Sequence, residues 1–201
     1  MSLFPPHTKP VIVRPPTNGL VRGERVVLRP YEDEFSEDEL ARLYRWSHDT
    51  EVLRWSGGTP VKMPFAEFKH FLHKDRLHPS PFRVVYAILT QGGELIGRIG
   101  YFDIEPERRQ AEMGVVLGEK NYWGLGYGRD AVLTLLRAVF EHTDLNRIYL
   151  FTFADNARAQ RCFAHCGFRR VSTDRYLRWG GKPAGEVKME ITRIDWERLS
   201  G

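Results

Sequence analysis

The sequence feature that most constrains this chain is a turn, residues 122–129, in which three glycines alternate with other residues. The turn joins a predicted strand to the longest predicted helix. Glycine lets the backbone approach a ligand closely and adopt positive φ angles, and the start of a helix offers unpaired N–H groups and partial positive charge. The pattern is typical of a pyrophosphate cradle, although a tight strand–helix turn without a ligand has the same glycine spacing.

Two other phosphate-binding patterns fit this turn poorly. A dinucleotide fingerprint has the form G-x-G-x-x-G after the first strand of a βαβ unit, whereas this chain has G-x-G-x-G after an apparent meander. A P-loop ends in Gly-Lys followed by Ser or Thr, and here Gly128 is followed by Arg129 and Asp130. The sequence therefore indicates a different phosphate-bearing cofactor.

The hydrophobic periodicity predicts an α/β fold with a central sheet. Helices are predicted to start near Ser36, which fits a capping box, and at Pro64, and to cover 132–140 and 156–165. The predicted strands cover residues 26–28, 82–89, 94–102, 113–117, 148–153, 168–179 and 186–194. The strands within 82–117 follow one another through short loops, which favours an antiparallel meander.

The chain has 201 residues, of which 42% are hydrophobic and 28% charged, so one globular domain is expected. We place it at residues 20–195, between a proline-rich extension (1–19) and a short tail (196–201). There is no apolar run long enough for a membrane helix, no secretory signal pattern and no disulfide framework. These features predict a cytoplasmic protein.

The net charge of +4 permits an anionic partner without requiring nucleic acid. The acidic run at 32–39 and the lack of a basic-aromatic motif make nucleic acid unlikely as a partner. His70 and His73 lie three residues apart, but no third ligand has a sensible spacing, so we expect no metal. Cys162 and Cys166 have no His/Asp pattern around them and fit small core residues better than nucleophiles.

The residues around the glycine turn resemble a known family. The runs Ala111–Gly118 and Tyr122–Gly128 are similar to the acetyl-CoA motif of the GNAT superfamily of N-acetyltransferases, whose pattern is Gln/Arg-x-x-Gly-x-Gly/Ala. Trp123 stands in the Gln/Arg place. Segments 145–148 and 156–168 resemble the next strand and helix, and 44–52 resembles the first helix of the branch that acetylates ribosomal-protein N-termini. The resemblance covers about residues 20–195.

The resemblance implies a GNAT fold: a mixed, mostly antiparallel sheet of about seven strands with about four flanking helices. It further implies that the strand before the glycine turn splays from its parallel neighbour and that acetyl-CoA is the co-substrate. The pantetheine arm would pair with the free strand edge as an added strand does. The implied cofactor-binding residues are Val115, Val116, Leu117, Trp123, Gly124, Leu125, Gly126, Tyr127, Gly128, Arg129, Asn156 and Arg161.

Asn156 has two roles in this interpretation, because the residue can cap the helix that follows it and can also hydrogen-bond the pantetheine. Four arginines without an acid among them follow within 156–170, namely Arg158, Arg161, Arg169 and Arg170. This patch suits a CoA phosphate, although solvated arginines are the ordinary explanation.

The expected reaction is attack of an amine on a thioester, which requires removal of a proton from the amine. Glu112, just before the cofactor strand, is the candidate base, and a solvated strand-end carboxylate is the alternative. The family often places a Tyr seven residues after the Asn to protonate the thiolate, but Phe163 stands there. Trp46, Arg54 and Trp55 are candidate acceptor-binding residues, or core and surface residues.

The sequence therefore predicts an acetyl-CoA-dependent N-acetyltransferase that acts by direct attack. A protein N-terminal amine or a small-molecule amine is the expected acceptor, and the chain is expected to be a monomer or a homodimer. The alternative is an acyl-CoA-binding sensor that has lost catalysis, which Phe163 motivates.

Overall fold

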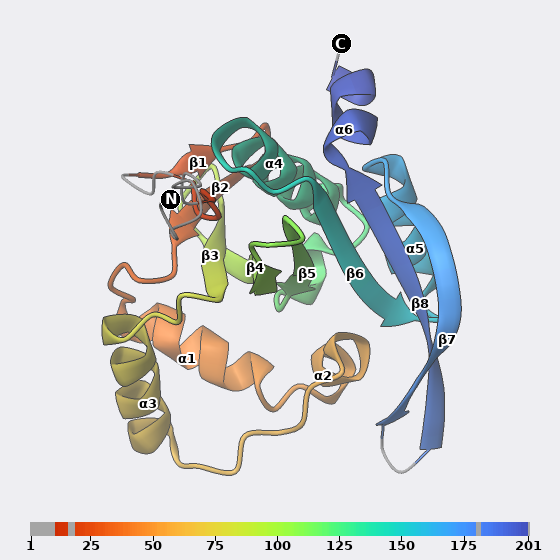
Figure 1. Cartoon of the computed structure of the whole chain (residues 1–201). Helices are drawn as coiled ribbons and strands as arrows, with labels where there is room; N and C mark the ends of the chain where they lie inside the picture. Colours follow the sequence, from red (N-terminus) through yellow and green to blue (C-terminus); the bar gives the residue numbers. More distant parts are fainter. Residues whose placement is uncertain (1–10, 16–18, 180–181, 201) are drawn as a thin grey trace, which may run out of the picture.

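The architecture is that of a computed structural model, which describes residues 11–15, 19–179 and 182–200, with the side chains of 172–184 and 200 outside the description. Most of the proline-rich extension, the turn at 180–181 and the last residue lie outside the described residues. The rest forms one eight-stranded sheet with helices on both faces, as Figure 1 shows.

The sheet has the strand order β1-β2-β3-β4-β5-β6-β8-β7. All neighbours are antiparallel except β5 and β6, which run parallel. The strands are β1 (Val21–Arg22), β2 (Val26–Pro30), β3 (Arg83–Thr90), β4 (Leu95–Glu105), β5 (Gln110–Leu117), β6 (Arg147–Phe153), β7 (Arg169–Trp179) and β8 (Lys182–Thr192). The predicted α/β class and mostly antiparallel mixed sheet are confirmed, with the two-residue β1 as the additional strand.

The described residues contain six α-helices where about four were predicted. They are α1 (Glu37–Trp46), α2 (Thr50–Ser56), α3 (Phe65–Leu77), α4 (Tyr127–His142), α5 (Ala157–His165) and α6 (Arg193–Ser200), and a 3₁₀ turn η1 (Lys120–Tyr122) precedes α4. The expected capping box at Ser36 is present: its hydroxyl accepts from Glu39 N–H, and the Glu39 carboxylate accepts from Ser36 N–H.

The two additional helices are defined by local caps more than by a long apolar period. Helix α2 starts where the Asp49 carboxylate accepts from the N–H groups of Glu51 and Val52, and it ends at Gly57 with φ +69°. The last strand was expected to run to residue 194 but ends at Thr192. There the Asp195 carboxylate accepts from the Thr192 hydroxyl and N–H, which starts α6.

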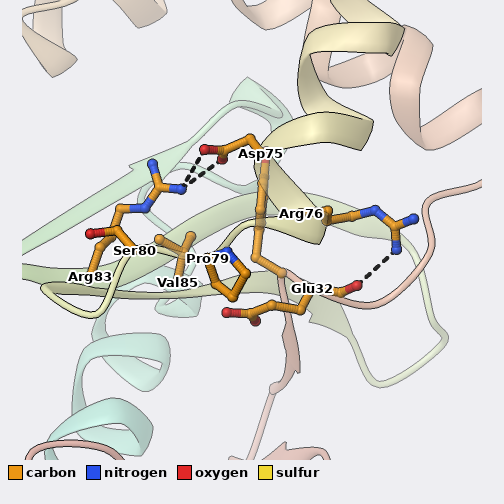
Figure 2. Close-up of a pocket in the computed structure, with 8 residues that line it drawn as sticks. Glu32, Asp75, Arg76, Pro79, Ser80, Arg83 and Val85 are labelled. Carbon is orange, nitrogen blue, oxygen red and sulfur yellow. Dashed lines mark hydrogen bonds and ion pairs between the residues drawn. The ribbon is translucent and has the colours of Figure 1, made fainter.

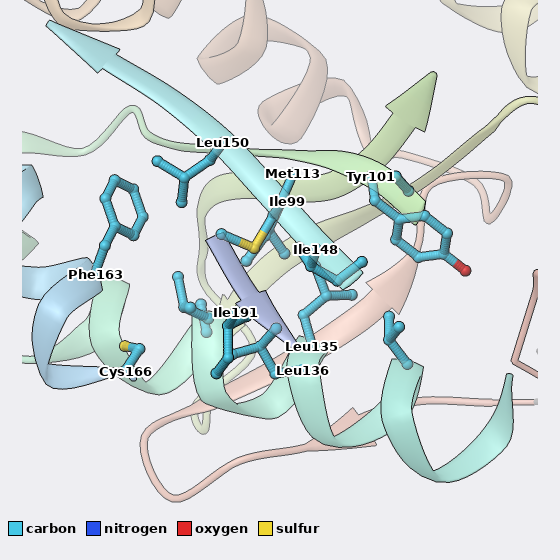
Figure 3. Packing of buried hydrophobic residues seen from close by; sticks show 14 of the residues in the cluster. Ile99, Tyr101, Met113, Leu135, Leu136, Ile148, Leu150, Phe163, Cys166 and Ile191 are labelled. Atoms are coloured by element: carbon cyan, nitrogen blue, oxygen red, sulfur yellow. The ribbon is translucent and has the colours of Figure 1, made fainter. Parts of the chain in front are cut away.

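The two faces of the sheet carry different helices and separate hydrophobic clusters. Helices α4 and α5 pack on one face, where Leu135, Leu136, Ile148 and Phe163 are buried together with residues of the central strands (Figure 3). Helices α1 and α3 cover the other face over β2 and β3 (Figure 1). Side chains alternate between the faces along each strand, and this alternation decides which residues can reach which side.

The described part of the N-terminal extension lies against the domain. The Val13 carbonyl accepts from the Tyr101 hydroxyl at 2.8 Å, and Ile12 N–H donates to the Asp144 carboxylate at 2.7 Å. Among the helices that the structure describes, none combines the length and apolar character needed to cross a membrane.

Candidate functional site

The parallel strands β5 and β6 separate partway along their length. They pair through Gln110–Arg147, Ala111–Ile148 and Glu112–Tyr149, and the pairing stops there. Strand β5 stays paired with β4 as far as Leu117, and β6 stays paired with β8 as far as Phe153. The edge of β5 that faces β6 is therefore open beyond Glu112, and the predicted splay is confirmed.

Alternation along β5 determines which backbone groups face this opening. Gly118 N–H donates to Ile96 O of β4 at 3.0 Å, so the backbone of Val116 also faces β4, and that of Val115 and Leu117 faces the opening. Of the three residues expected to meet the pantetheine, Val115 and Leu117 have backbone groups on the open side of β5. The backbone of Val116 faces β4, and its side chain packs against the hydrophobic cluster under α1 and α3.

The glycine turn (residues 122–129) connects β5, through η1, to the start of α4. Gly124 has φ +75° and Gly126 has φ +88°, values that favour glycine. A Cβ built on Gly124 would have no atom within 4 Å, so its backbone is open to an approaching group. Helix α4 makes its first helical bond from Asp130 N–H to Gly126 O, which leaves the first-turn N–H groups without helical partners. These groups and the helix dipole form a site for an anion.

Trp123 connects the turn to both walls of the opening. Its indole N–H donates to the Leu117 carbonyl at 2.9 Å, and its ring lies under the guanidinium of Arg158, 4.2 Å from ring centroid to Cζ. Arg158 comes from the first turn of α5, which follows β6. An arginine from the opposite wall is thus stacked on the Trp that stands in the Gln/Arg place of the motif. The sequence did not single out Arg158 from its neighbours, because the stack joins residues 35 positions apart.

Asn156 caps α5, as one of its two expected roles requires. Its side-chain oxygen accepts from Ala159 N–H at 3.1 Å, and the residue is 6% exposed. No residue that the structure describes accepts a hydrogen bond from the Asn156 Nδ2 group. That donor is therefore available to a ligand.

The four-arginine patch is divided by the fold. Arg158 and Arg161 are exposed on α5. Arg169 is held by the buried Glu190 carboxylate at 2.9 Å, so its charge is already balanced. Arg129, exposed in the first turn of α4, supplies another cation near the glycine turn, and Leu125 is exposed beside it. Tyr127 instead packs edge-on against Tyr122, 4.9 Å between centroids.

Glu112 lies at the vertex where β5 and β6 part, half-buried between Phe102 of β4 and Tyr149 of β6 in the strand register. Its neighbours Ala111 and Met113 are buried on the α4 face. Alternation therefore directs the Glu112 side chain to the opposite face, which carries α1 and α2. A carboxylate at this position stands at the end of the open strand edge.

The three residues expected near the acceptor have different surroundings. Trp46, the last residue of α1, is buried and donates its indole N–H to the Glu119 carboxylate at 3.0 Å, which is the core role the sequence left open. Arg54 lies over the Trp55 ring at 4.6 Å and pairs with Asp155 at 3.5 Å. Arg54 and Trp55 thus lie beside the loop that leads from β6 into α5.

Phe163 lies in the core, 7% exposed, with its ring 5.9 Å from that of Phe168 (Figure 3). It has no proton to donate.

Cys166 is buried in the same cluster and donates to the Arg129 carbonyl at 3.8 Å, as expected for a core cysteine. The hydrogen bond between the thiols lowers the pKa of Cys162 and, together with burial, raises that of Cys166. The described residues hold no group of three His, Cys, Asp or Glu side chains arranged for a metal ion.

Comparison with known proteins agrees with this geometry. A sequence profile described as "Acetyltransferase (GNAT) domain" matches residues 25–169. An uncharacterized N-acetyltransferase, p20 of Bacillus licheniformis, is 39% identical over 126 residues, covering 62% of this chain and 68% of the relative. Aminoglycoside N(6')-acetyltransferase type 1 of Klebsiella pneumoniae is 24% identical over 148 residues, covering 69% and 73%.

Solved structures share the fold at lower identity. A spermidine N-acetyltransferase from Vibrio cholerae, in complex with CoA and spermine, superposes with a TM-score of 0.72 at 18% identity, covering 86% of this chain and 98% of that one. A GCN5-related N-acetyltransferase from Brucella melitensis superposes with a TM-score of 0.75 at 19% identity, covering 94% and 85%. Because the profile spans most of the chain, this protein belongs to the GNAT family of acetyl-CoA-dependent N-acetyltransferases.

Proposed function

We propose that the chain binds acetyl-CoA in the opening between β5 and β6 and transfers its acetyl group directly to a primary amine that approaches from the α1–α2 face. The observation that carries this proposal is the end of β5–β6 pairing at Glu112 and Tyr149. It leaves an unpaired strand edge that leads straight into a glycine turn and a helix N-terminus. A pantetheine arm can pair with that edge as an added strand, with its pyrophosphate at the turn.

The residues around the opening fit such a ligand. The open space over Gly124 and the first-turn N–H groups of α4 suit a pyrophosphate. Arg158 and Arg129 are exposed cations on the two walls, and Asn156 Nδ2 is a donor beside the arm. Arg161, one turn along α5 from Arg158, is a candidate for a further phosphate of CoA.

The proposed reaction forms a C–N bond and breaks a C–S bond. The amine nitrogen attacks the thioester carbonyl, the amine proton passes to Glu112 directly or through water, and CoA leaves as a thiolate that takes a proton from solvent. An alkyl ammonium group has a pKa near 10, so a base is needed at neutral pH. A thiol has a pKa of about 8.5, well below that of an alkyl ammonium group, so CoA can leave as a thiolate without a proton donor. The buried Phe163, which cannot donate a proton, is consistent with this.

A protein N-terminal amine is the acceptor that the segment 44–52 favours by its resemblance to the ribosomal-protein branch. A small-molecule amine is the other candidate within the class, and two similar proteins carry names of that kind, for aminoglycosides and spermidine. Both acceptors fit the cytoplasmic location that the sequence favours.

A second candidate function is a sensor that binds acyl-CoA without turnover, which the buried Phe163 supports. A screen of N-terminal peptides and small amines for release of the CoA thiol separates the two. Calorimetric binding of acetyl-CoA together with thiol release by any amine supports the enzyme. Binding without release across the whole screen supports the sensor, and no binding contradicts both.

A further inference from the structure

Arg98 occupies an unusual place for a charged residue. It lies on β4, near the middle of the sheet, between Ala87 of β3 and Val116 of β5. Ile99 and Tyr101 are buried on the α4 face, so Arg98 points to the face that carries α1 and α3. The residue is nevertheless exposed. The helices therefore leave this part of the central sheet open to solvent.

The guanidinium of Arg98 has no acidic partner. Among the residues that the structure describes, no carboxylate lies within ion-pair distance of it. Its charge acts on the Tyr31 hydroxyl. Burial raises the pKa of Tyr31, and the charge of Arg98 opposes that rise.

Tyr31 also lines a small pocket at the start of β3, together with Glu32, Asp75, Arg76 and Arg83. The charges of that pocket balance. Arg83 donates to both oxygens of Asp75, at 2.8 and 2.7 Å, and Arg76 donates to the Glu32 carbonyl at 2.8 Å (Figure 2). The two acids and two arginines of the pocket wall balance one another in charge. Arg98 therefore adds one positive charge that the described pocket residues do not neutralise. This part of the face therefore attracts an anion.

Arg98 and Glu112 lie on the same face of β4 and β5, and the Phe102 ring lies over Gly114 between them. Gly100 and Gly114 are direct partners across β4 and β5, on the same face and between the two charged residues. Since Arg98 pairs with Val116, four residues from Glu112, strand geometry separates the two Cα atoms by about 14 Å. A molecule with an apolar middle can lie against the Phe102 ring with one end toward each charge.

We propose that the acceptor is a primary amine that also carries a carboxylate several bonds away from the nitrogen. Arg98 binds that carboxylate, and the amine lies toward Glu112. The inference rests on the proposed function and deepens it by naming the acceptor class. A polycationic acceptor of the same length would place a positive charge against Arg98. The carboxylate can belong to a free ω-amino acid or to an acidic residue near a peptide N-terminus.

The test measures thiol release from acetyl-CoA with matched acceptors. One arm compares ω-amino acids of three to eight carbons with diamines of the same lengths. The other compares peptides that bear Asp or Glu at the first two positions with the same peptides bearing Asn or Gln. We expect the carboxylate-bearing member to have the higher kcat/KM in at least one arm, by about tenfold, as a charge-assisted contact supplies. The arm that responds identifies the source of the carboxylate.

Variants locate the contact. Arg98→Gln is expected to remove the preference by raising KM for the acceptor about tenfold, with KM for acetyl-CoA unchanged, and Arg98→Lys to retain part of it. Arg98→Glu is expected to favour the diamines. Arg108→Gln, on an exposed arginine of the β4–β5 loop, is the matched control and leaves the preference intact. Lys188→Gln tests a second cation on this face, which lies over the Tyr149 ring at 4.3 Å.

Three outcomes overturn the inference: a preference for diamines in wild type, a preference that survives Arg98→Gln, or one that is lost in Lys188→Gln instead. In each of these cases the amine is still acetylated, so the proposed function stands. No thiol release with any acceptor of either arm overturns both.

Discussion

The stack of Arg158 on Trp123 leads to the most detailed prediction. Arg158→Ala removes a guanidinium that lies 4.2 Å from the Trp123 ring centroid, at the mouth of the opening between β5 and β6. A hydrogen bond to a charged group contributes about 1.5–3 kcal/mol. Because Arg158 is exposed and screened, we take the lower end of that range. Since about 1.4 kcal/mol is tenfold in affinity, Arg158→Ala should weaken acetyl-CoA binding about tenfold.

The ring is expected to act through the arginine. Trp123→Ala removes the cation–π contact, worth about 0.5–1 kcal/mol at an exposed site, and the hydrogen bond to the Leu117 carbonyl. If the indole holds Arg158 in place, the double variant loses less than the sum of the two single losses. Trp123→Phe keeps a ring under the guanidinium and should lose less than Trp123→Ala. Arg108→Ala, on an exposed arginine of the β4–β5 loop, is the control.

The assay is calorimetric titration with acetyl-CoA at low and moderate salt. The affinity of the wild type should fall more steeply with salt than that of Arg158→Ala, because one phosphate contact is missing from the variant. The reasoning is refuted if Arg158→Ala binds acetyl-CoA as tightly as wild type at low salt. Strict additivity of the two single losses would refute the claim that Trp123 positions the arginine.

Three further predictions concern catalysis, the core and pH. Glu112→Gln should lower kcat about a hundredfold or more with little change in KM for acetyl-CoA, as loss of a general base does, and an unchanged kcat would remove Glu112 from that role. Phe163→Tyr should lower the free energy of unfolding by about 1–3 kcal/mol in denaturant titrations without raising kcat, because the new hydroxyl enters a buried cluster; a faster and equally stable variant would contradict this. The Tyr122 hydroxyl and Arg42 lower the pKa of Glu94, so its contribution to stability is present above about pH 4.3 and is lost as the pH falls through its folded value. Wild type should therefore lose more stability than Glu94→Gln between about pH 6 and pH 3, and parallel losses would show that this carboxyl is not linked to folding.

Much of the fold follows from local patterns in the sequence. The period of the α4 helix, the alternation within β8 and the caps at Ser36 and Asn156 are short-range signals, and each of these elements is present, although the bounds of α4 and β8 differ from those predicted. Helix α2 was missed because seven residues are too few for a clear helical period. The end of β8 was misplaced by two residues, since Thr192 caps α6 through reciprocal hydrogen bonds with Asp195 that alternation does not reveal.

The sequence predicted the parts of the site that consist of backbone groups, because glycine spacing and strand order determine where those groups lie. Glycine spacing located the turn, and the resemblance located the splayed strands. The side chains that complete the site depend on contacts between distant segments. The stack of Arg158 on Trp123 and the exposed place of Arg98 on a central strand arise only when the sheet assembles. Trp46, a predicted acceptor-binding residue, is instead buried in the core and donates a hydrogen bond to Glu119.

The central claim is that this chain moves an acetyl group from acetyl-CoA to an amine in the opening between β5 and β6. The most direct measurement is release of the CoA thiol with the acceptor panel, in wild type and in Glu112→Gln, with the acetylated product identified by mass spectrometry. The account predicts thiol release that requires both substrates, an amide on the acceptor nitrogen and a large loss in the variant. Acetyl-CoA binding with no acetylated product from any amine would contradict it.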